Sequence, residues 1–233
     1  MAETGPSAII SGAAGGIGRG LAEGFLAAGY AVIGVDRAAA GWDAPGFTYV
    51  PLDVSDGDAV AAFGAGCDRL DVLVNAAGII RRIEEFELPV FEQVIDVNLT
   101  GTMRLCTACR PALAARGGAI VNIASMLSFF GGALVPAYSA SKGGIVTLTK
   151  SLAVAWAKDN IRVNAIAPGW IATPLTIALQ ADEKRSRTIL ERTPMGRWGE
   201  PGDLVGPALF LAGPAARFVT GAVLPVDGGY SSM

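Results

Sequence analysis

The residues best suited to chemistry in this chain are Tyr138 and Lys142, with Ser125 thirteen residues before the tyrosine. The sequence contains no histidine, so the side chain that most often transfers protons in enzymes is missing. In a helix, residues four positions apart lie on one face, and a lysine ammonium there favours the phenolate form of tyrosine. The pattern predicts a tyrosine that exchanges a proton near neutral pH, with Ser125 as a hydroxyl donor beside it.

A Tyr-x-x-x-Lys pair also occurs by chance, so the prediction needs independent support, and a glycine-rich turn near the N-terminus provides it. Residues 7–12 predict a buried strand, and residues 16–28 predict a helix that ends at a glycine. Glycines let the backbone approach a pyrophosphate, and the helix N-terminus stabilises its charge. The turn residues expected to bind a dinucleotide are Gly12, Gly15, Gly16, Ile17 and Gly18.

The second predicted strand, residues 30–36, ends in an acidic residue, Asp36, which is followed by Arg37. A carboxylate at this place can accept hydrogen bonds from the adenosine ribose and would repel a 2′-phosphate. Asp36 therefore favours NAD over NADP, although Arg37 could partly offset the repulsion. The alternative is that Asp36 only forms a turn at the end of the strand.

Strand and helix patterns alternate along the chain, and the short apolar runs are typical of parallel strands buried on both faces. Right-handed crossovers then predict an α/β fold, a single-domain Rossmann-type doubly wound sheet of about seven parallel strands with helices on both faces. Residues 1–233 are expected to form this one domain. Short connections after the second and third strands indicate a trimmed helix on one face. The predicted strands are residues 7–12, 30–36, 47–52, 70–75, 118–124, 161–166 and 222–226, and the predicted helices are residues 16–28, 56–65, 88–115, 138–158, 182–192 and 201–212.

Composition agrees with a buried parallel sheet, because 52% of the residues are hydrophobic and only 17% are charged. The net charge of −3 gives no case for binding nucleic acid or an anionic membrane. We find no apolar stretch of the length that spans a bilayer and no signal-peptide pattern, so a cytoplasmic location is expected.

Three cysteines, Cys67, Cys106 and Cys109, do not form a disulfide framework. Cys106 and Cys109 have the spacing of a redox or metal motif, but they lie in a predicted helix and have no histidine partner. We interpret them as buried helix residues and expect no metal site.

The motifs together resemble the short-chain dehydrogenase/reductase family over essentially the whole chain. Asn98, Ser125, Tyr138 and Lys142 match that family's catalytic tetrad. Gly12, Gly16 and Gly18 match its cofactor loop, although Ser11 replaces the usual threonine before the first glycine. The resemblance implies further cofactor contacts from Asp53, Val54, Asn75, Ala76, Ala77, Gly78, Pro168, Gly169, Ile171 and Thr173, where Ala76 replaces an asparagine of the family motif.

The resemblance also implies a role for each member of the tetrad. Tyr138 exchanges the proton with the substrate, and Lys142 lowers the pKa of Tyr138 and contacts the nicotinamide ribose. Ser125 orients the substrate carbonyl. Asn98 positions a water that relays protons to the lysine; alternatively, it is an ordinary polar helix residue.

A closer resemblance, to 2-deoxy-D-gluconate 3-dehydrogenases and 2-dehydro-3-deoxy-D-gluconate 5-dehydrogenases, rests on five segments. It implies an NAD-dependent oxidation or reduction of a sugar acid. The alternatives are another enzyme of the fold, such as a gluconate 5-dehydrogenase or a 3-oxoacyl carrier-protein reductase, and a non-catalytic dinucleotide sensor. The segments are residues 78–82, 123–129, 181–186, 196–199 and 203–207.

A sugar-acid substrate needs a partner for its carboxylate, and arginine offers bidentate geometry. Among Arg81, Arg82, Arg187, Arg192 and Arg197 we favour Arg82 and Arg192. Residues 170–197 are expected to form a partly helical flap over the substrate. Met126 and Trp170 could line the pocket with Leu127 and Phe129, or belong to the core or an interface. The resemblance also implies a homotetramer, built on residues 88–115, 138–158 and 219–233.

Overall fold

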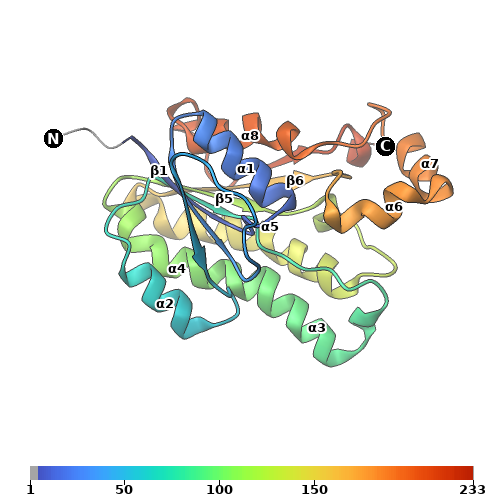
Figure 1. Cartoon of the computed structure of the whole chain (residues 1–233), viewed down its shortest axis with the longest axis horizontal. Helices are drawn as coiled ribbons and strands as arrows, with labels where there is room; N and C mark the ends of the chain where they lie inside the picture. Colours follow the sequence, from blue (N-terminus) through green and yellow to red (C-terminus); the bar gives the residue numbers. More distant parts are fainter. Residues whose placement is uncertain (1–4, 233) are drawn as a thin grey trace.

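The computed structural model of the chain describes residues 5–232 and is built on one seven-stranded sheet (Figure 1). The strand order is β3-β2-β1-β4-β5-β6-β7, and every neighbouring pair is parallel. The predicted fold class is confirmed, and each predicted strand lies within one or two residues of its observed bounds. The strands are β1 (Ser7–Ser11), β2 (Ala31–Asp36), β3 (Phe47–Pro51), β4 (Val72–Asn75), β5 (Ala119–Ile123), β6 (Arg162–Pro168) and β7 (Val223–Val226).

Helices cover both faces of the sheet. Successive residues of each central strand point to opposite faces, so the apolar side chains of one strand pack against both layers of helices. Ile9, Leu73 and Ile120 pack under α2 (Gly57–Ala65), α4 (Gly101–Ala114) and α5 (Pro136–Trp156). Ile10 and Val74 face the other side, where α1 (Gly16–Ala27) and α8 (Val205–Ala212) complete the core. Figure 1 shows these two layers of helices with the sheet between them.

The connection between β2 and β3 contains no helix, as the short spacing predicted. Trp42 packs there instead, with its ring stacked 3.9 Å from that of Phe47. The Trp42 indole N–H donates a 3.0 Å hydrogen bond to the carbonyl of Ala13 in the glycine-rich turn. The trimmed side of the sheet is thus closed by an aromatic pair.

The helix predicted over residues 88–115 is helical from Leu88 to Ala114, but it is not one uninterrupted α-helix. Helix α3 (Leu88–Ile95) passes into a π-helical turn (Asp96–Thr100) before α4 begins. A π-turn inserts an extra residue and rotates the side chains beyond it, and such turns are frequent at functional sites. Here it carries the buried Asn98.

Several other helix bounds also differ from the predictions. The helix predicted over residues 182–192 is α7 (Glu183–Glu191), preceded by the short α6 (Ile177–Ala181). Asp182 separates them by accepting a 3.0 Å hydrogen bond from the backbone N–H of Arg185, the usual geometry of an N-cap. Helix α5 begins two residues early, at Pro136, a residue favoured in the first turn. No helix among the described residues is long and apolar enough to cross a membrane.

Candidate active site

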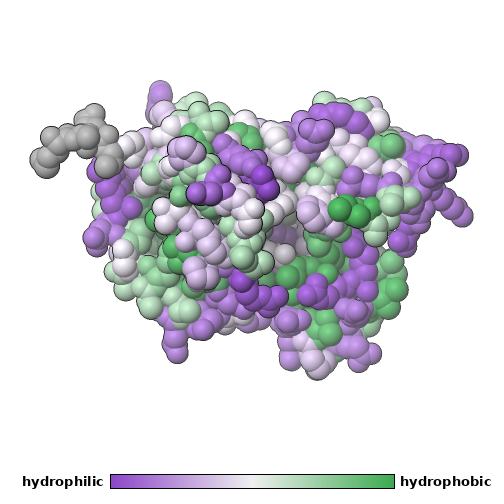
Figure 2. All heavy atoms as spheres, in the orientation of Figure 1, coloured by the Kyte–Doolittle hydropathy of each residue, from purple (hydrophilic) through white to green (hydrophobic). Residues whose placement is uncertain are grey.

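A cavity of about 370 Å³ opens at the carboxyl ends of the central strands, where the strand order reverses between β1 and β4. This reversal is where doubly wound sheets bind ligands. Figure 2 shows a hollow near the middle of the face, bordered by both polar and apolar residues. The cavity residues that the sequence predicted are Gly12, Gly15, Gly16, Ile17, Gly18, Asp36, Arg37, Asp53, Val54, Ala76, Ala77, Gly78, Tyr138, Lys142 and Thr173.

Four residues expected to contact the cofactor are not in the lining of this cavity. The Asn75 amide points into the core, where it donates to Asn122 Oδ1 at 2.9 Å. Pro168 and Gly169 end β6 and begin the loop after it. Ile171 lines a separate cavity, described below.

The glycine-rich turn is shaped for close approach of the backbone. Gly12 has φ +75°, and a Cβ there would lie 2.8 Å from the carbonyl oxygen of Ala76. A Cβ on Gly18 would lie 2.1 Å from the carbonyl oxygen of Gly12. The N-cap of α1 is Gly15, which supplies no side-chain hydrogen bond, so the first N–H groups of the helix face the cavity mouth without a cap. This cradle fits a pyrophosphate.

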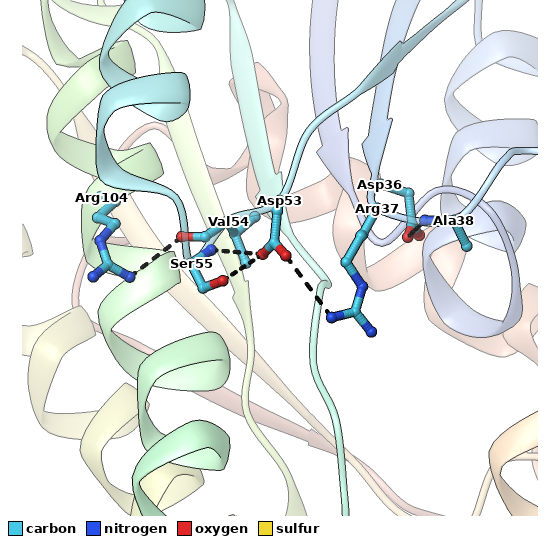
Figure 3. Close-up of polar contacts among 7 residues, drawn as sticks. All are labelled: Asp36, Arg37, Ala38, Asp53, Val54, Ser55 and Arg104. Carbon is cyan, nitrogen blue, oxygen red and sulfur yellow. Dashed lines mark hydrogen bonds and ion pairs between the residues drawn. The ribbon is translucent and has the colours of Figure 1, made fainter.

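The carboxylate of Asp36 is fixed in the cavity lining beside the glycine-rich turn. Its Oδ2 accepts a 3.0 Å hydrogen bond from Ala14 N, and its Oδ1 accepts one from Ala38 N at 3.0 Å. Arg37 points away, with Nη1 3.8 Å from Oδ2 of Asp53 (Figure 3). Hydrogen bonds from Ser55 are the main cause that holds the pKa of Asp53 below its usual value. The two backbone hydrogen bonds therefore hold the negatively charged Asp36 carboxylate in one orientation.

Lys142 is buried beside Tyr138, as helical spacing predicted. Its side chain is 5% exposed, and Nζ donates a 2.6 Å hydrogen bond to the carbonyl of Ile123 at the end of β5. The same atom lies 5.6 Å from the centre of the Tyr138 ring. Burial lowers the pKa of Lys142 to about 8.

The pKa of Tyr138 differs from the sequence expectation, because it is raised rather than lowered. Removal of the phenol from water is the largest cause and disfavours its charged form. A hydrogen bond with Ser125 and the positive charge of Arg82 lower the pKa, whereas the charge of Glu85 raises it. Lys142 directs its ammonium at the Ile123 carbonyl.

Ser125 and Asn98 are anchored next to the pair. Ser125 Oγ accepts a 3.1 Å hydrogen bond from Leu127 N, and Ser128 Oγ joins this turn to α5 by donating to the Lys142 carbonyl at 2.7 Å. Asn98 is 1% exposed and bonds to the backbone of Ile79 and, at 3.1 Å, to Ser141 Oγ. Tyr138 and Lys142 thus line the cavity, whereas Ser125 and Asn98 lie behind the lining and contact Tyr138 and Ile79, which belong to it.

The four predicted substrate residues do not form one group. Arg82 is near enough to Tyr138 to influence its pKa, and Met126 is buried beside Ser125. Trp170 instead lines a second cavity of about 380 Å³ and meets Trp198 edge to face. Arg192 is exposed, with its guanidinium 4.5 Å from the Tyr230 ring centre and 5.3 Å from that of Phe130.

Sequence reasoning missed six residues of the first cavity and one buried acid. Some of the six adjoin predicted residues: Ile79 follows Gly78, and Pro174 follows Thr173. Glu85 had no such signal, because nothing in its local pattern separates it from its exposed acidic neighbours. The missed cavity residues are Leu52, Ile79, Val97, Ile123, Pro174 and Leu175.

The two cysteines of α4 that have the spacing of a redox or metal motif are packed in the protein core. Cys106 and Cys109 are buried in the core and free of disulfides. Burial raises the pKa of each thiol to about 12, which keeps it protonated and unreactive. The interpretation as buried helix residues is confirmed.

Known proteins resemble this chain along nearly its full length. A family model described as enoyl-(acyl carrier protein) reductase matches residues 12–231. The 2-dehydro-3-deoxy-D-gluconate 5-dehydrogenase of Escherichia coli strain K12 is 42% identical over 245 residues, with 97% of this chain and 95% of that protein covered.

Two solved structures have the same fold. A protein from Agrobacterium tumefaciens, provisionally named a 2-deoxy-D-gluconate 3-dehydrogenase and solved with bound NADP, has a TM-score of 0.89 and 42% identity, with 99% of this chain and 98% of that one covered. A gluconate 5-dehydrogenase from Burkholderia cenocepacia J2315, in complex with NADP and tartrate, has a TM-score of 0.90 and 36% identity, with 98% and 96% covered.

Proposed function

Because this chain belongs to the short-chain dehydrogenase/reductase family of oxidoreductases acting on CH–OH groups, we propose that it interconverts a secondary alcohol and a ketone on a sugar acid. The proposed substrate is of the 2-dehydro-3-deoxy-D-gluconate or 2-deoxy-D-gluconate type. The half-buried Tyr138 and the buried Lys142 line the same cavity as the pyrophosphate cradle of the glycine-rich turn, and this arrangement carries the proposal. A nicotinamide dinucleotide bound in that cavity supplies or takes up the hydride.

In the proposed reduction, the phenol of Tyr138 gives its proton to the carbonyl oxygen as that oxygen gains negative charge. The Ser125 hydroxyl donates to the same oxygen and stabilises it. The Lys142 ammonium keeps positive charge beside the phenolate that remains. In the oxidation, Tyr138 takes the proton from the substrate hydroxyl. Asn98 supports these groups by fixing the backbone at Ile79 and the Ser141 hydroxyl.

Arg82 is the proposed partner of the substrate carboxylate, since its charge acts on Tyr138. A substrate held between Arg82 and Tyr138 has its acid group and its reacting carbon in fixed positions. Tartrate, which is a hydroxy acid, is bound in the Burkholderia cenocepacia relative. Arg192, stacked on two aromatic rings, is the second candidate. Residues 170–197 are proposed to close over this region, because Thr173, Pro174 and Leu175 already line the cavity.

NAD is the proposed cofactor. Two backbone hydrogen bonds hold the Asp36 carboxylate in place, so a 2′-phosphate would meet a fixed negative charge. NADP is bound in two of the relatives described above, and the largely exposed Arg37 is the residue of this chain that could accept it. A homotetramer and a cytoplasmic location stay predictions from the family resemblance.

The proposal is tested by initial rates of reduction with NADH and NADPH. The substrates are 2-dehydro-3-deoxy-D-gluconate, 5-keto-D-gluconate and a β-ketoacyl thioester. We expect the highest kcat/KM for the deoxy keto acid with NADH. Preference for 5-ketogluconate would indicate a gluconate 5-dehydrogenase, and turnover of the thioester alone would overturn the sugar-acid proposal.

A further inference from the structure

Glu85 is a buried carboxylate outside the predicted tetrad. It lies on a 3-10 turn (Glu84–Phe86) between β4 and α3 and is 1% exposed. Its Oε1 accepts a 2.8 Å hydrogen bond from Arg81 N, and its Oε2 accepts one from Tyr138 N at 2.8 Å. One side chain therefore joins the backbone next to Arg82 to the backbone of Tyr138.

The segment that Glu85 holds has a strained conformation. Ile83 has φ 72° and ψ −46°, a region that a β-branched residue rarely adopts. Such strain persists only where surrounding contacts impose it, and it clusters at functional sites. The contacts here are a 2.8 Å hydrogen bond from Ile83 N to the Leu134 carbonyl and the two bonds of Glu85.

The chemistry of this contact requires two acceptor oxygens. Both Glu85 oxygens face backbone N–H donors, so a glutamine would turn its NH₂ group toward one donor and lose that bond. The carboxylate also adds a negative charge beside Tyr138. The charged or titratable groups around the Tyr138 phenol are then Glu85, Arg82 and Lys142, with the Ser125 hydroxyl as a hydrogen-bond partner.

We propose that Glu85 is a positioning residue that fixes Arg82 relative to Tyr138, so that an acid group bound by Arg82 brings the reacting carbon to the phenol. This inference rests on the proposed function. It assigns to Glu85 no contact with the substrate; the effect passes through the backbone of residues 81 and 138.

The first test is Glu85→Gln, with Glu84→Gln, an exposed neighbour on the same turn, as the matched control. For E85Q we expect kcat to fall about 10- to 100-fold, as when reacting groups are slightly misplaced. KM for the keto acid should rise, while Kd for the dinucleotide should stay unchanged. In the pH–rate profile of the oxidation, the part in which the rate increases with pH should move about 0.5 pH units to lower pH, because a negative charge near the phenol is removed. E84Q should behave as the wild type.

The second test is a double-mutant cycle with Arg82→Met. If Glu85 acts by placing Arg82, E85Q should raise KM much less in the R82M background than in the wild type. Additive effects on KM together with an unshifted pH profile would overturn the inference. If E85Q does not fold, Glu85→Asp decides: it keeps the charge and both acceptors on a shorter side chain. Lower kcat with a wild-type pH–rate profile is expected, and wild-type kcat would overturn the inference.

Failure of this inference can be told apart from failure of the proposed function by Tyr138→Phe. An active Y138F enzyme would contradict the proposed mechanism itself. An inactive Y138F together with an E85Q enzyme that behaves as the wild type would contradict only the role of Glu85.

Discussion

Asn98 and Ile79 are joined by two hydrogen bonds, one to each polar group of the Ile79 backbone. Asn98 Oδ1 accepts from Ile79 N at 2.8 Å, and Nδ2 donates to Ile79 O at 2.9 Å. The Asn98 side chain thus bonds to the Ile79 backbone as a neighbouring strand would, although Ile79 is not part of the sheet. The π-turn of residues 96–100 carries Asn98.

Asn98→Ala should leave both Ile79 groups without these partners. We expect the free energy of unfolding to fall by about 2–4 kcal/mol and dinucleotide binding to weaken, because Ile79 and Gly78 line the cavity. Thermal unfolding and a binding titration measure the two effects. Unchanged stability would show that water replaces the amide without cost.

Tyr138→Phe should bind NADH with the wild-type Kd yet lose about 10²- to 10⁴-fold in kcat, the usual contribution of a proton-transfer group. Tyr30→Phe is a matched control, because Tyr30 packs against Phe25 on the opposite face of the sheet. Fluorescence titration and steady-state rates are the measurements. Wild-type turnover by Y138F would exclude Tyr138 as the proton donor.

Lys142→Met should stabilise the protein and abolish turnover. The folded-state pKa of Lys142, about 8, lies below its ordinary value of 10.5. Below pH 8 the lysine is charged in both states, so the folded state bears the full cost of burial, about 3 kcal/mol. Between pH 8 and 10.5 the unfolded state binds more protons, so this group makes stability increase with pH.

The K142M substitution should therefore raise the unfolding free energy at pH 7 by about 1–3 kcal/mol. It should also make the stability of the protein rise less with pH above pH 8. Chemical denaturation at pH 7 and 9.5 checks both effects, with the exposed Lys150→Met on the same helix as control. A loss of stability in K142M at pH 7 would contradict the prediction.

Asp36→Asn removes a charge while keeping one acceptor for the backbone N–H groups of Ala14 and Ala38. We expect the ratio of kcat/KM for NADPH to that for NADH to rise about 10-fold, since relieving about 1.4 kcal/mol of repulsion has this effect. The nearby exposed Asp43→Asn should leave the ratio unchanged. An unchanged ratio in D36N would mean that Asp36 only forms a turn at the end of the strand and does not select the cofactor.

Arg82→Met should raise KM for the keto acid about 10- to 100-fold, because a charge-assisted pair is lost. Arg192→Met should have a much smaller effect if its guanidinium mainly stacks on Phe130 and Tyr230. Comparing KM for the acid with KM for its methyl ester isolates the carboxylate. The reverse ranking would assign the carboxylate to Arg192.

Periodicity and turn residues predicted the sheet closely, because buried parallel strands are short apolar runs bounded by glycine, asparagine or proline. The helix of residues 88–115 was predicted without its π-turn, since the cause lies in contacts of Asn98 with distant residues. Tyr138, Lys142 and Ser125 were predicted from their types and spacing, and Asn98 from the family resemblance. The direction of the Tyr138 pKa was not, because burial depends on the packed structure, and Glu85 was missed for the same reason.

The stacking of Trp42 on Phe47 gives this protein its own optical reporter of the nucleotide site. The indole N–H is bonded to Ala13, a residue of the turn that forms the pyrophosphate cradle. Movement of that turn changes the polarity and hydrogen bonding around a fluorescent ring. We therefore expect the emission of Trp42, one of four tryptophans in the chain, to change when the cradle is occupied, which would report binding without a label and without turnover.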